Sequence, residues 1–212
     1  MNKKFKSTLI ILYYFIYTFF IYIPFSILNI EIVGVLLFGI SLIYIYREDF
    51  KNYLDDFKKN GRKYLKLGFN YWIIGLLMMI VSNIIISSLS PISMPENEQA
   101  VREALKLSPY IIFLSSVINA PLIEELIFRK TLFDIFKNKT LFVIFSGLLF
   151  GTFHVIGVAT SIYSWLYIIP YSALGIAFAY AYTKTNNLLT PICLHSFHNF
   201  ITIVQILLFL GG

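Results

Sequence analysis

Long apolar runs alternate with short polar segments along the whole chain. A helix that crosses the hydrocarbon core of a bilayer needs about 20 apolar residues. The pattern predicts spans at residues 8–28, 30–46, 68–90, 109–128, 140–158, 162–183 and 188–210. The fourth helix is expected to continue inward to about residue 137. We therefore predict an all-α fold, a polytopic transmembrane helical bundle of about seven spans.

The fifth and sixth spans come from one stretch that has to be divided. Residues 140–183 contain no Asp, Glu, Lys or Arg and are too long for a single crossing. Gly157, Ser161 and Ser164 lie in the middle of this stretch, and such residues favour turns. We therefore predict a turn there, between two antiparallel helices.

Basic residues mark one side of the predicted membrane protein. Lysine and arginine gather in the N-terminal tip and in residues 47–67 and 129–139, whereas the alternate connections contain only Arg102 and Lys106. Cytoplasmic loops are enriched in Lys and Arg. The distribution therefore predicts that the N-terminus is cytoplasmic and that the C-terminus is outside.

The segment 47–67 is charged and is expected to lie outside the bilayer. Within this cytoplasmic amphipathic loop, Phe50, Leu54 and Phe57 recur at near-helical spacing, which predicts an amphipathic helix over residues 47–60 that lies on the membrane surface. The N-terminal apolar run lacks a signal-peptide cleavage site, so we interpret it as a retained first span. We expect residues 1–212 to form a single membrane domain.

Composition agrees with a membrane protein and excludes other classes. Of the 212 residues, 58% are hydrophobic and 13% are charged, and the mean hydropathy is +0.76. A soluble domain of this size could not bury so much apolar surface, and disordered chains are poor in apolar residues. The net charge of +6 lies in loops between spans, so it indicates topology and contact with membrane lipid, with no nucleic acid partner.

Two further features of composition bear on the class of protein and on its cellular location. The single cysteine, Cys193, excludes an intramolecular disulfide and a cysteine-based zinc cluster. The abundance of Ile, Lys, Asn, Phe and Tyr is typical of AT-rich bacterial genomes. We therefore expect an integral protein of the bacterial plasma membrane.

Several polar residues lie inside the predicted spans, where an ionisable group costs about 2.5–3.5 kcal/mol on insertion scales. They are Glu124, Glu125, His154, His195, His198 and Asn199. A single membrane histidine can be an ordinary hydrogen-bonding group, and an adjacent Glu pair followed by Arg can be a salt bridge at the membrane edge. Three such motifs on spans that can meet indicate a functional site instead.

Helical geometry separates the roles of these residues. Glu125 and Arg129 are four residues apart on one helix face, so they are predicted to pair. Glu124 points about 100° away from Glu125 and is free to face the bundle interior. Glu124 and His154 both lie about 15 residues from the predicted turn near 137–139, so we expect them at one depth, in the cytoplasmic half or near the centre of the membrane. Pro121 is expected to kink the helix just before Glu124.

The polar set suits hydrolysis by an activated water. A carboxylate and an imidazole flanking a water form a general-base device, and Asn and His side chains can donate to an oxyanion. Glu124, His154 and His195 are also candidate ligands for zinc or another divalent metal, because two histidines and a glutamate form a known catalytic zinc set. These residues leave metal-dependent and metal-free chemistry both open.

The three motifs are Glu124-Glu125-x-x-x-Arg129, Phe150-x-x-x-His154 and His195-x-x-x-Asn199. In this order they resemble the motifs of the CPBP family, which contains CAAX proteases and bacteriocin-processing enzymes and is also called the type II CAAX prenyl endopeptidase or Abi family. The resemblance covers about residues 109–205, which we interpret as the catalytic core.

The resemblance implies an intramembrane endopeptidase that cleaves a membrane-associated protein or peptide precursor, of CAAX type or of bacteriocin or leader type. It implies that Glu124 and His154 activate the water, and that His195 and Asn199 stabilise the oxyanion. Glu125 and Arg129 would support the site, and His198 is a possible additional member. The family is described both as metalloproteases and as glutamate proteases.

Two other functions fit the same residues. A non-catalytic protein for bacteriocin self-immunity or peptide binding could keep the fold and use the polar pocket to hold a peptide. An ion-coupled transporter could use the intramembrane Glu and His residues as a relay. The sequence lacks paired broken helices in two matching halves, which argues against the transporter.

Overall fold

The computed structural model describes residues 3–17 and 31–209, and these ranges contain helices and no strand. In the first half of the chain the helices are α1 (Lys3–Ile16), α3 (Glu31–Ile45), α4 (Arg47–Leu89) and α5 (Glu96–Leu107). One long helical segment follows, made of α6 (Pro109–Leu114), η2 (Ser115–Asn119), α7 (Ala120–Glu125), η3 (Leu126–Thr131) and α8 (Leu132–Ile135). The last elements are α9 (Lys139–Val155), η4 (Ile162–Tyr167), α10 (Ile168–Thr185) and α11 (Leu189–Phe209).

The predicted all-α membrane bundle is confirmed. Four helical segments among the described residues are long and apolar enough to cross a membrane: Arg47–Leu89, Pro109–Ile135, Ile162–Thr185 and Leu189–Phe209. The shorter apolar helices Val33–Ile45 and Lys139–Val155 coincide with the predicted second and fifth spans. The predicted first span, 8–28, reaches beyond the described residues. The count of seven spans and the orientation stay predictions.

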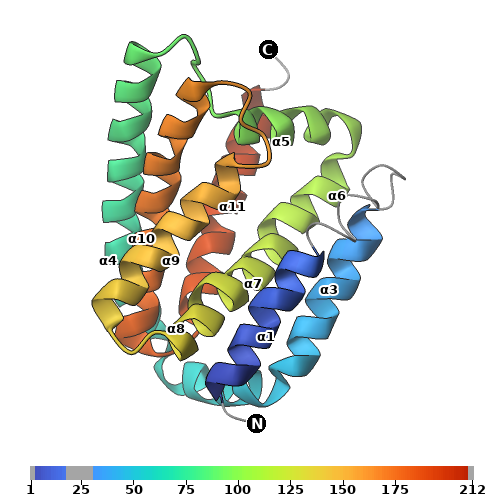
Figure 1. Cartoon of the computed structure of the whole chain (residues 1–212), viewed down its shortest axis with the longest axis vertical. Helices are drawn as coiled ribbons and strands as arrows, with labels where there is room; N and C mark the ends of the chain where they lie inside the picture. The colour runs from blue at the N-terminus through green and yellow to red at the C-terminus, as the bar shows by residue number, and fades with distance from the viewer. Residues whose placement is uncertain (1–2, 18–30, 210–212) are drawn as a thin grey trace.

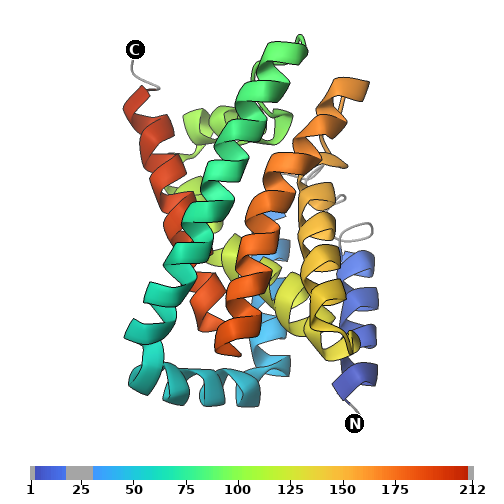
Figure 2. The ribbon, with the colours of Figure 1, turned by 90° about the vertical axis from the view of Figure 1, so that its left-hand side faces the viewer.

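The amphipathic helix predicted within residues 47–60 is present. It does not end before the next span, because residues 47–67 are helical throughout and continue without interruption into that span as α4. Figure 2 shows that α4 runs across the end of the bundle and then turns along the bundle axis. The charged first limb therefore keeps the helical, amphipathic character that its spacing predicted. No proline interrupts residues 47–90, and the helix runs through Asn60-Gly61, a pair that favours a turn.

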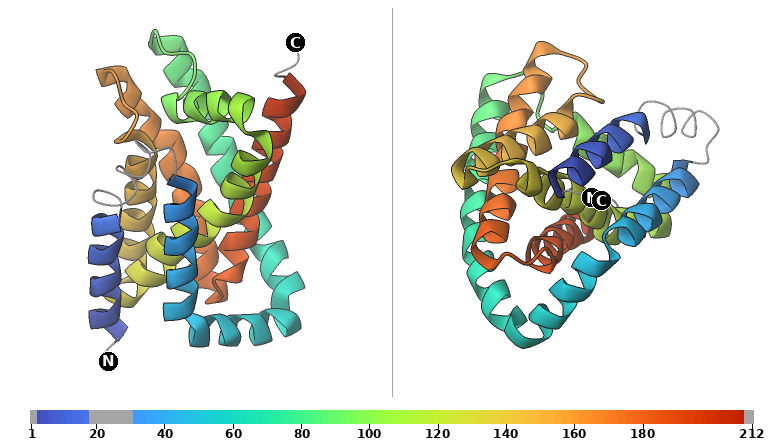
Figure 3. Two further views of the ribbon diagram at one scale, coloured as in Figure 1. Left: turned by 90° about the vertical axis from the view of Figure 1, so that its right-hand side faces the viewer. Right: turned by 60° about the horizontal axis from the view of Figure 1, so that its bottom comes forward.

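The elements of the bundle reach two distinct ends. The start of α1 and the first limb of α4 lie at one end, whereas α5 and the end of α11 lie at the other (Figure 1). Figure 3, in the view from below, shows the first limb of α4 crossing the end where α1 begins. The described termini thus point to opposite ends of the bundle, which agrees with an odd number of crossings.

Close packing of small residues brings α9, α10 and α4 together. A Cβ atom added at Gly147 of α9 would lie 2.8 Å from the backbone nitrogen of Ile176 of α10, and one added at Gly151 would lie 2.6 Å from the carbonyl oxygen of Ile168. The glycines therefore let the two backbones touch. This contact fixes the helix that carries His154.

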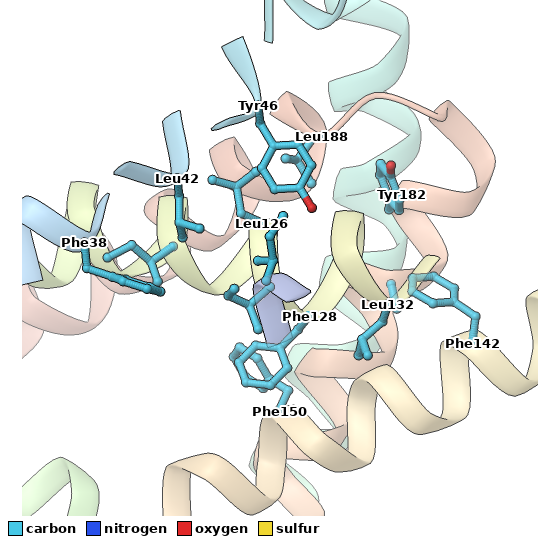
Figure 4. Packing of buried hydrophobic residues seen from close by; sticks show 14 of the residues in the cluster. Phe38, Leu42, Tyr46, Leu126, Phe128, Leu132, Phe142, Phe150, Tyr182 and Leu188 are labelled. Carbon is cyan, nitrogen blue, oxygen red and sulfur yellow. The ribbon is translucent and has the colours of Figure 1, made fainter. Parts of the chain in front are cut away.

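The main core lies between the N-terminal helices and the end of the long helical segment. Figure 4 shows the cluster, to which α3, the segment after Glu125, α9 and α10 all contribute aromatic or aliphatic side chains. Its fully buried members include Phe38, Leu42, Phe142 and Leu188. The core therefore holds the C-terminal part of the Glu124 helix rigidly against its neighbours.

Candidate active site

The helical segment Pro109–Ile135 carries the first motif and departs twice from α-helical geometry. Widened π-helical turns at Ser115–Asn119 and Leu126–Thr131 flank the short α-helical piece α7. Single π-helical turns are frequent at functional sites, because they rotate the side chains that follow. Glu124 and Glu125 are presented between these two turns.

A buried ion pair forms the support of the site. The side chains of Glu125 and Arg129 are fully buried, with Arg129 Nε 2.8 Å from Glu125 Oε2 and Arg129 Nη2 3.1 Å from Oε1. Arg129 Nη1 also donates to Ser146 Oγ at 3.1 Å, and the guanidinium lies over the ring of Phe150. Both charges are thus compensated where an unpaired charge would be very costly. The predicted pairing of Glu125 with Arg129 is confirmed.

His195 is held by this ion pair. Its Nδ1 lies 3.0 Å from Glu125 Oε1, and its ring stacks on Phe178 at a centroid distance of 5.0 Å. A carboxylate only accepts hydrogen bonds, so Nδ1 carries the donated proton, and the Nε2 of the neutral ring keeps a lone pair. That Nε2 atom lies 3.9 Å from Glu124 Oε2.

His154 is oriented in the same way by its own helix. Its Nδ1 donates to the carbonyl oxygen of Phe150 at 2.8 Å, and its ring stacks on Tyr171 at a centroid distance of 4.7 Å. The Nε2 lone pair of the neutral ring is therefore free, and it lies 3.8 Å from Glu124 Oε2. The expectation that Glu124 and His154 lie at one depth is confirmed.

One carboxylate oxygen is the meeting point of these groups. Glu124 Oε2 is buried and has no hydrogen-bond partner among the described residues. The two histidine nitrogens that face it, on His154 and His195, are too distant for direct hydrogen bonds. Polar groups at such separations are suited to sharing a small bridging molecule such as water. The arrangement therefore provides three hydrogen-bond acceptors around one position.

A cavity of about 300 Å³ adjoins this carboxylate. The predicted site residues that line it are Glu124, His154, His198 and Asn199. His195 is almost completely buried beside Glu124 and is not among the lining residues. Glu125 and Arg129 lie behind it, where they contact the site only through other side chains.

The cavity extends toward the end of the bundle that carries α5. Asn97, Glu98 and Val101 of α5 line it, and α5 lies at the end opposite the start of α1 (Figure 1). The sequence predicted a site in the cytoplasmic half or near the centre. With a cytoplasmic N-terminus, the cavity instead lies on the outer side of Glu124. The sequence argument used the distance from the turn near 137–139, which fixes the depth of Glu124 but not the direction of access.

The donor set suits zinc chemically, because it offers two neutral imidazole nitrogens and one carboxylate oxygen. Ligands of one zinc ion lie about 2.0–2.2 Å from the metal, so their donor atoms are closer together than the separations of 3.8 and 3.9 Å found here. In the described ranges, no group of three His, Cys, Asp or Glu side chains is arranged to hold a metal ion. The metal site at Glu124, His154 and His195 stays a prediction.

Three supporting groups were missed by sequence reasoning. Ser146 donates to the carbonyl oxygen of Phe128 at 2.6 Å and thereby ties Arg129 to α9. Phe178 and Tyr171 of α10 support the rings of the two histidines. Apolar and hydroxyl residues of this kind occur throughout the spans, so nothing in their types or spacing distinguishes them.

Comparison with known proteins agrees with this constellation. Residues 106–201 match the family described as Type II CAAX prenyl endopeptidase Rce1-like. The match contains all three motifs, but not the residues of α5 that line the cavity. Over residues 106–201, which are less than half of the chain, the protein is similar to the Rce1-like family. The Rce1-like segment therefore includes the helices from Pro109 to the first part of α11 and excludes α1, α3 and α4.

Individual relatives come from bacteria. The "Putative membrane peptidase YdiL" of Bacillus subtilis (strain 168) is 32% identical over 115 residues, which cover 52% of this chain and 43% of the relative. "UPF0177 protein YxdF" of Lactococcus lactis subsp. lactis (strain IL1403) is 26% identical over 145 residues, which cover 65% of this chain and 77% of the relative. The alignment with YdiL thus spans less than half of that protein. No solved structure matches the chain.

The bacterial relatives and the long apolar helices establish the location. The chain is an integral membrane protein of the bacterial plasma membrane. Its Rce1-like segment places polar side chains within the apolar helices, where their burial requires the mutual pairing seen between Glu125, Arg129 and His195.

Proposed function

We propose that this protein is an intramembrane endopeptidase that hydrolyses a peptide bond of a membrane-associated protein or peptide precursor by means of a water activated by Glu124. The proposal depends above all on one observation. Glu124 Oε2 is buried and unpartnered at the wall of a cavity, and the Nε2 atoms of two histidines lie 3.8 and 3.9 Å from it. The family match supports peptidase chemistry in general.

The first step of the proposed reaction is attack by water. Glu124 accepts a proton from the water, and His154 Nε2 accepts a hydrogen bond from its other hydrogen and orients it. The water oxygen forms a bond to the peptide carbonyl carbon, and the carbonyl oxygen becomes an oxyanion. Positioned general-base groups of this kind contribute about 10²–10⁴-fold to rate.

The second step is stabilisation and collapse of the oxyanion. In its neutral form His195 has no hydrogen on Nε2, so it donates there only as an imidazolium, which the adjacent Glu125 carboxylate stabilises. Asn199 offers a second donor, because its Nδ2 carries two hydrogens and Ser116 O takes one. The carbon–nitrogen bond then breaks, and the proton held by Glu124 passes to the leaving amine.

The cavity wall favours an apolar peptide segment. Its lining contains apolar side chains from six parts of the fold: Tyr14, Met79, Val101, Ala120, Phe128, Phe153, Ile203 and Ile206. Within the described residues its charged members are Glu98 and Glu124, both acidic. We therefore propose a substrate that is uncharged around the cleaved bond, as in a membrane-associated leader or precursor peptide. An acidic segment would meet repulsion from Glu124, whereas the charge of Glu98 is compensated by Arg102.

Comparative peptidomics of a deletion strain tests this function in cells. The strain is complemented with the wild type, with Glu124→Gln, or with Glu103→Gln as a matched change at an exposed residue. We expect the wild type and Glu103→Gln to restore the same cleaved peptides and Glu124→Gln to leave the uncleaved precursor. Full processing by well-expressed Glu124→Gln would overturn the proposal and favour a non-catalytic immunity or peptide-binding role.

A further inference from the structure

Two side chains of α11 hold the Glu124 helix at points on either side of Glu124. His195 contacts Glu125, and Asn199, one helical turn later, donates from Nδ2 to the carbonyl oxygen of Ser116 at 2.8 Å. The two residues are four positions apart and so lie on one face of α11. Together they bracket the stretch of helix that presents Glu124 to the cavity.

The carbonyl of Ser116 is free to accept because of the proline. In the π-helical turn the amide of Ala120 bonds to the carbonyl of Ser115, five residues back. In this register the amide that would bond to Ser116 O is that of residue 121. Residue 121 is proline, which has no N–H to donate. The Asn199 amide supplies the missing donor from a neighbouring helix.

We propose that Asn199 is a positioning residue, whose amide replaces the hydrogen bond that Pro121 cannot make and thereby fixes the direction in which Glu124 faces the cavity. The proposal rests on the proposed function, since it assigns a role in the same site. A proline weakens the helix at its own position and permits a kink. Glu124 lies only three residues after Pro121, so its direction depends on the angle of that kink.

The positioning role predicts that a second substitution can compensate for the loss of Asn199, which direct contact with substrate does not predict. Without Asn199 the carbonyl of Ser116 loses its donor, and the kink at Pro121 is free to vary. Changing Pro121 to alanine returns an N–H at the position where Ser116 O needs one. The second change should therefore repair the effect of the first. Pro121→Ala cannot replace the hydrogen that Asn199 donates to the oxyanion, so the repair concerns only the part of the loss that comes from positioning.

The test is a four-variant cycle with kcat and KM measured on purified, reconstituted protein and its cognate peptide. We expect Asn199→Ala to lower kcat by about 10²-fold, because misplacement of a catalytic group by about 1 Å has effects of that size. We expect KM to change little, and the double variant with Pro121→Ala to cleave about 10-fold faster than Asn199→Ala alone. A double variant as slow as Asn199→Ala would overturn the positioning role. Asn199→Leu, of similar volume and without a donor, serves where the alanine variant does not fold.

A second measurement separates this inference from the proposed function. Thermal unfolding of the same four variants in detergent requires no cleavage. We expect the two substitutions to be coupled, so that Pro121→Ala raises the unfolding temperature more in the Asn199→Ala background than in the wild type. The exposed Asn70→Ala should combine additively with Pro121→Ala. If the changes in unfolding temperature caused by the substitutions at positions 121 and 199 are additive, the positioning role of Asn199 is overturned even where cleavage is observed. If the two changes are coupled but no variant cleaves a peptide, only the proposed function is overturned.

Discussion

At the scale of single residues, the site depends on how a buried arginine is compensated. Arg129 is fully buried and meets a carboxylate, a hydroxyl and an aromatic ring, on Glu125, Ser146 and Phe150. Glu125 in turn accepts from His195. The ion pair therefore connects the helix that carries Glu124 to α9 and α11, and it sets the ring orientation of His195.

Removal of one partner of this pair should be severe. Glu125→Ala leaves an uncompensated buried charge on Arg129, and we expect it to destabilise the fold by about 3–5 kcal/mol. The double variant Glu125→Leu/Arg129→Met removes both charges and should be more stable than Glu125→Ala. Chemical unfolding in detergent compares the variants. A Glu125→Ala protein as stable as the wild type would contradict the account of this pair.

The sequence predicted that Glu125 pairs with Arg129 and that the histidines of other helices lie near Glu124, but it did not predict the contact of His195 with Glu125. The pairing of Glu125 with Arg129 follows from a spacing of four residues, and the common depth of Glu124 and His154 follows from their distances to one turn. The contact of His195 with Glu125 depends on the rotation of α11 about its axis, which the sequence pattern does not fix. Ser146 was missed because many serines lie in these spans, and nothing in the sequence distinguishes the one that contacts Arg129.

At the scale of elements, the helical segment Pro109–Ile135 shows how a predicted kink is realised. Pro121 was expected to bend the helix and open space beside Glu124. The structure places π-helical turns before and after α7. The departure from regular α-helical geometry near Pro121 is therefore partly a widening of the helix. Sequence reasoning identified the proline but could not assign the donor that replaces its amide, because that donor comes from α11.

The helix α5 lies against the cavity and is attached by a titratable contact. The hydroxyl of Thr160 hydrogen-bonds to the Glu96 carboxylate, and the backbone N–H of Thr160 donates to it at 3.2 Å. The hydroxyl bond in particular lowers the pKa of Glu96 below its ordinary value of 4.5. The contact is therefore complete above the ordinary pKa and is lost as the pH falls through the lowered pKa.

Loosening of α5 by Glu96→Gln tests this contact. At pH 7 we expect the variant to exchange amide hydrogens in α5 a few-fold faster than the wild type, with α11 unchanged, because the carboxylate that accepts from Thr160 is missing. The difference between the two proteins should close as the pH falls through the lowered pKa of Glu96, where the wild-type carboxylate takes up a proton. Hydrogen exchange with mass spectrometry measures both. Equal exchange at pH 7 would show that the contact does not hold α5.

At the scale of the whole molecule, the fold gathers the basic N-terminal segments at one end of the bundle, as the distribution of basic residues in the sequence predicted. The basic N-terminal tip and the charged limb of α4 lie together, opposite α5 (Figures 1 and 2). Hydrophobic runs predicted most helix boundaries to within a few residues, since bilayer thickness fixes their length. The exception was α4, where the amphipathic helix and the following span were expected to be separate but form one continuous helix.

The predicted orientation can be measured directly. In a Cys193→Ser background we expect Glu103→Cys in α5 to react with a membrane-impermeant maleimide on intact cells. Lys51→Cys in α4 should react only after the cells are permeabilised, because cytoplasmic segments carry the excess of basic residues. Both positions are exposed in the structure. The reverse labelling pattern would invert the orientation and place the cavity on the cytoplasmic side of Glu124.

The central claim is that Glu124 is the base of a hydrolytic site in the membrane, and single-turnover cleavage by purified protein tests it most directly. Wild type, Glu124→Gln and Glu103→Gln are reconstituted in lipid and mixed in excess with the cognate peptide. We predict that Glu124→Gln slows cleavage by about 10²-fold or more while Glu103→Gln cleaves at the wild-type rate. Cleavage at the wild-type rate by folded Glu124→Gln would contradict the account.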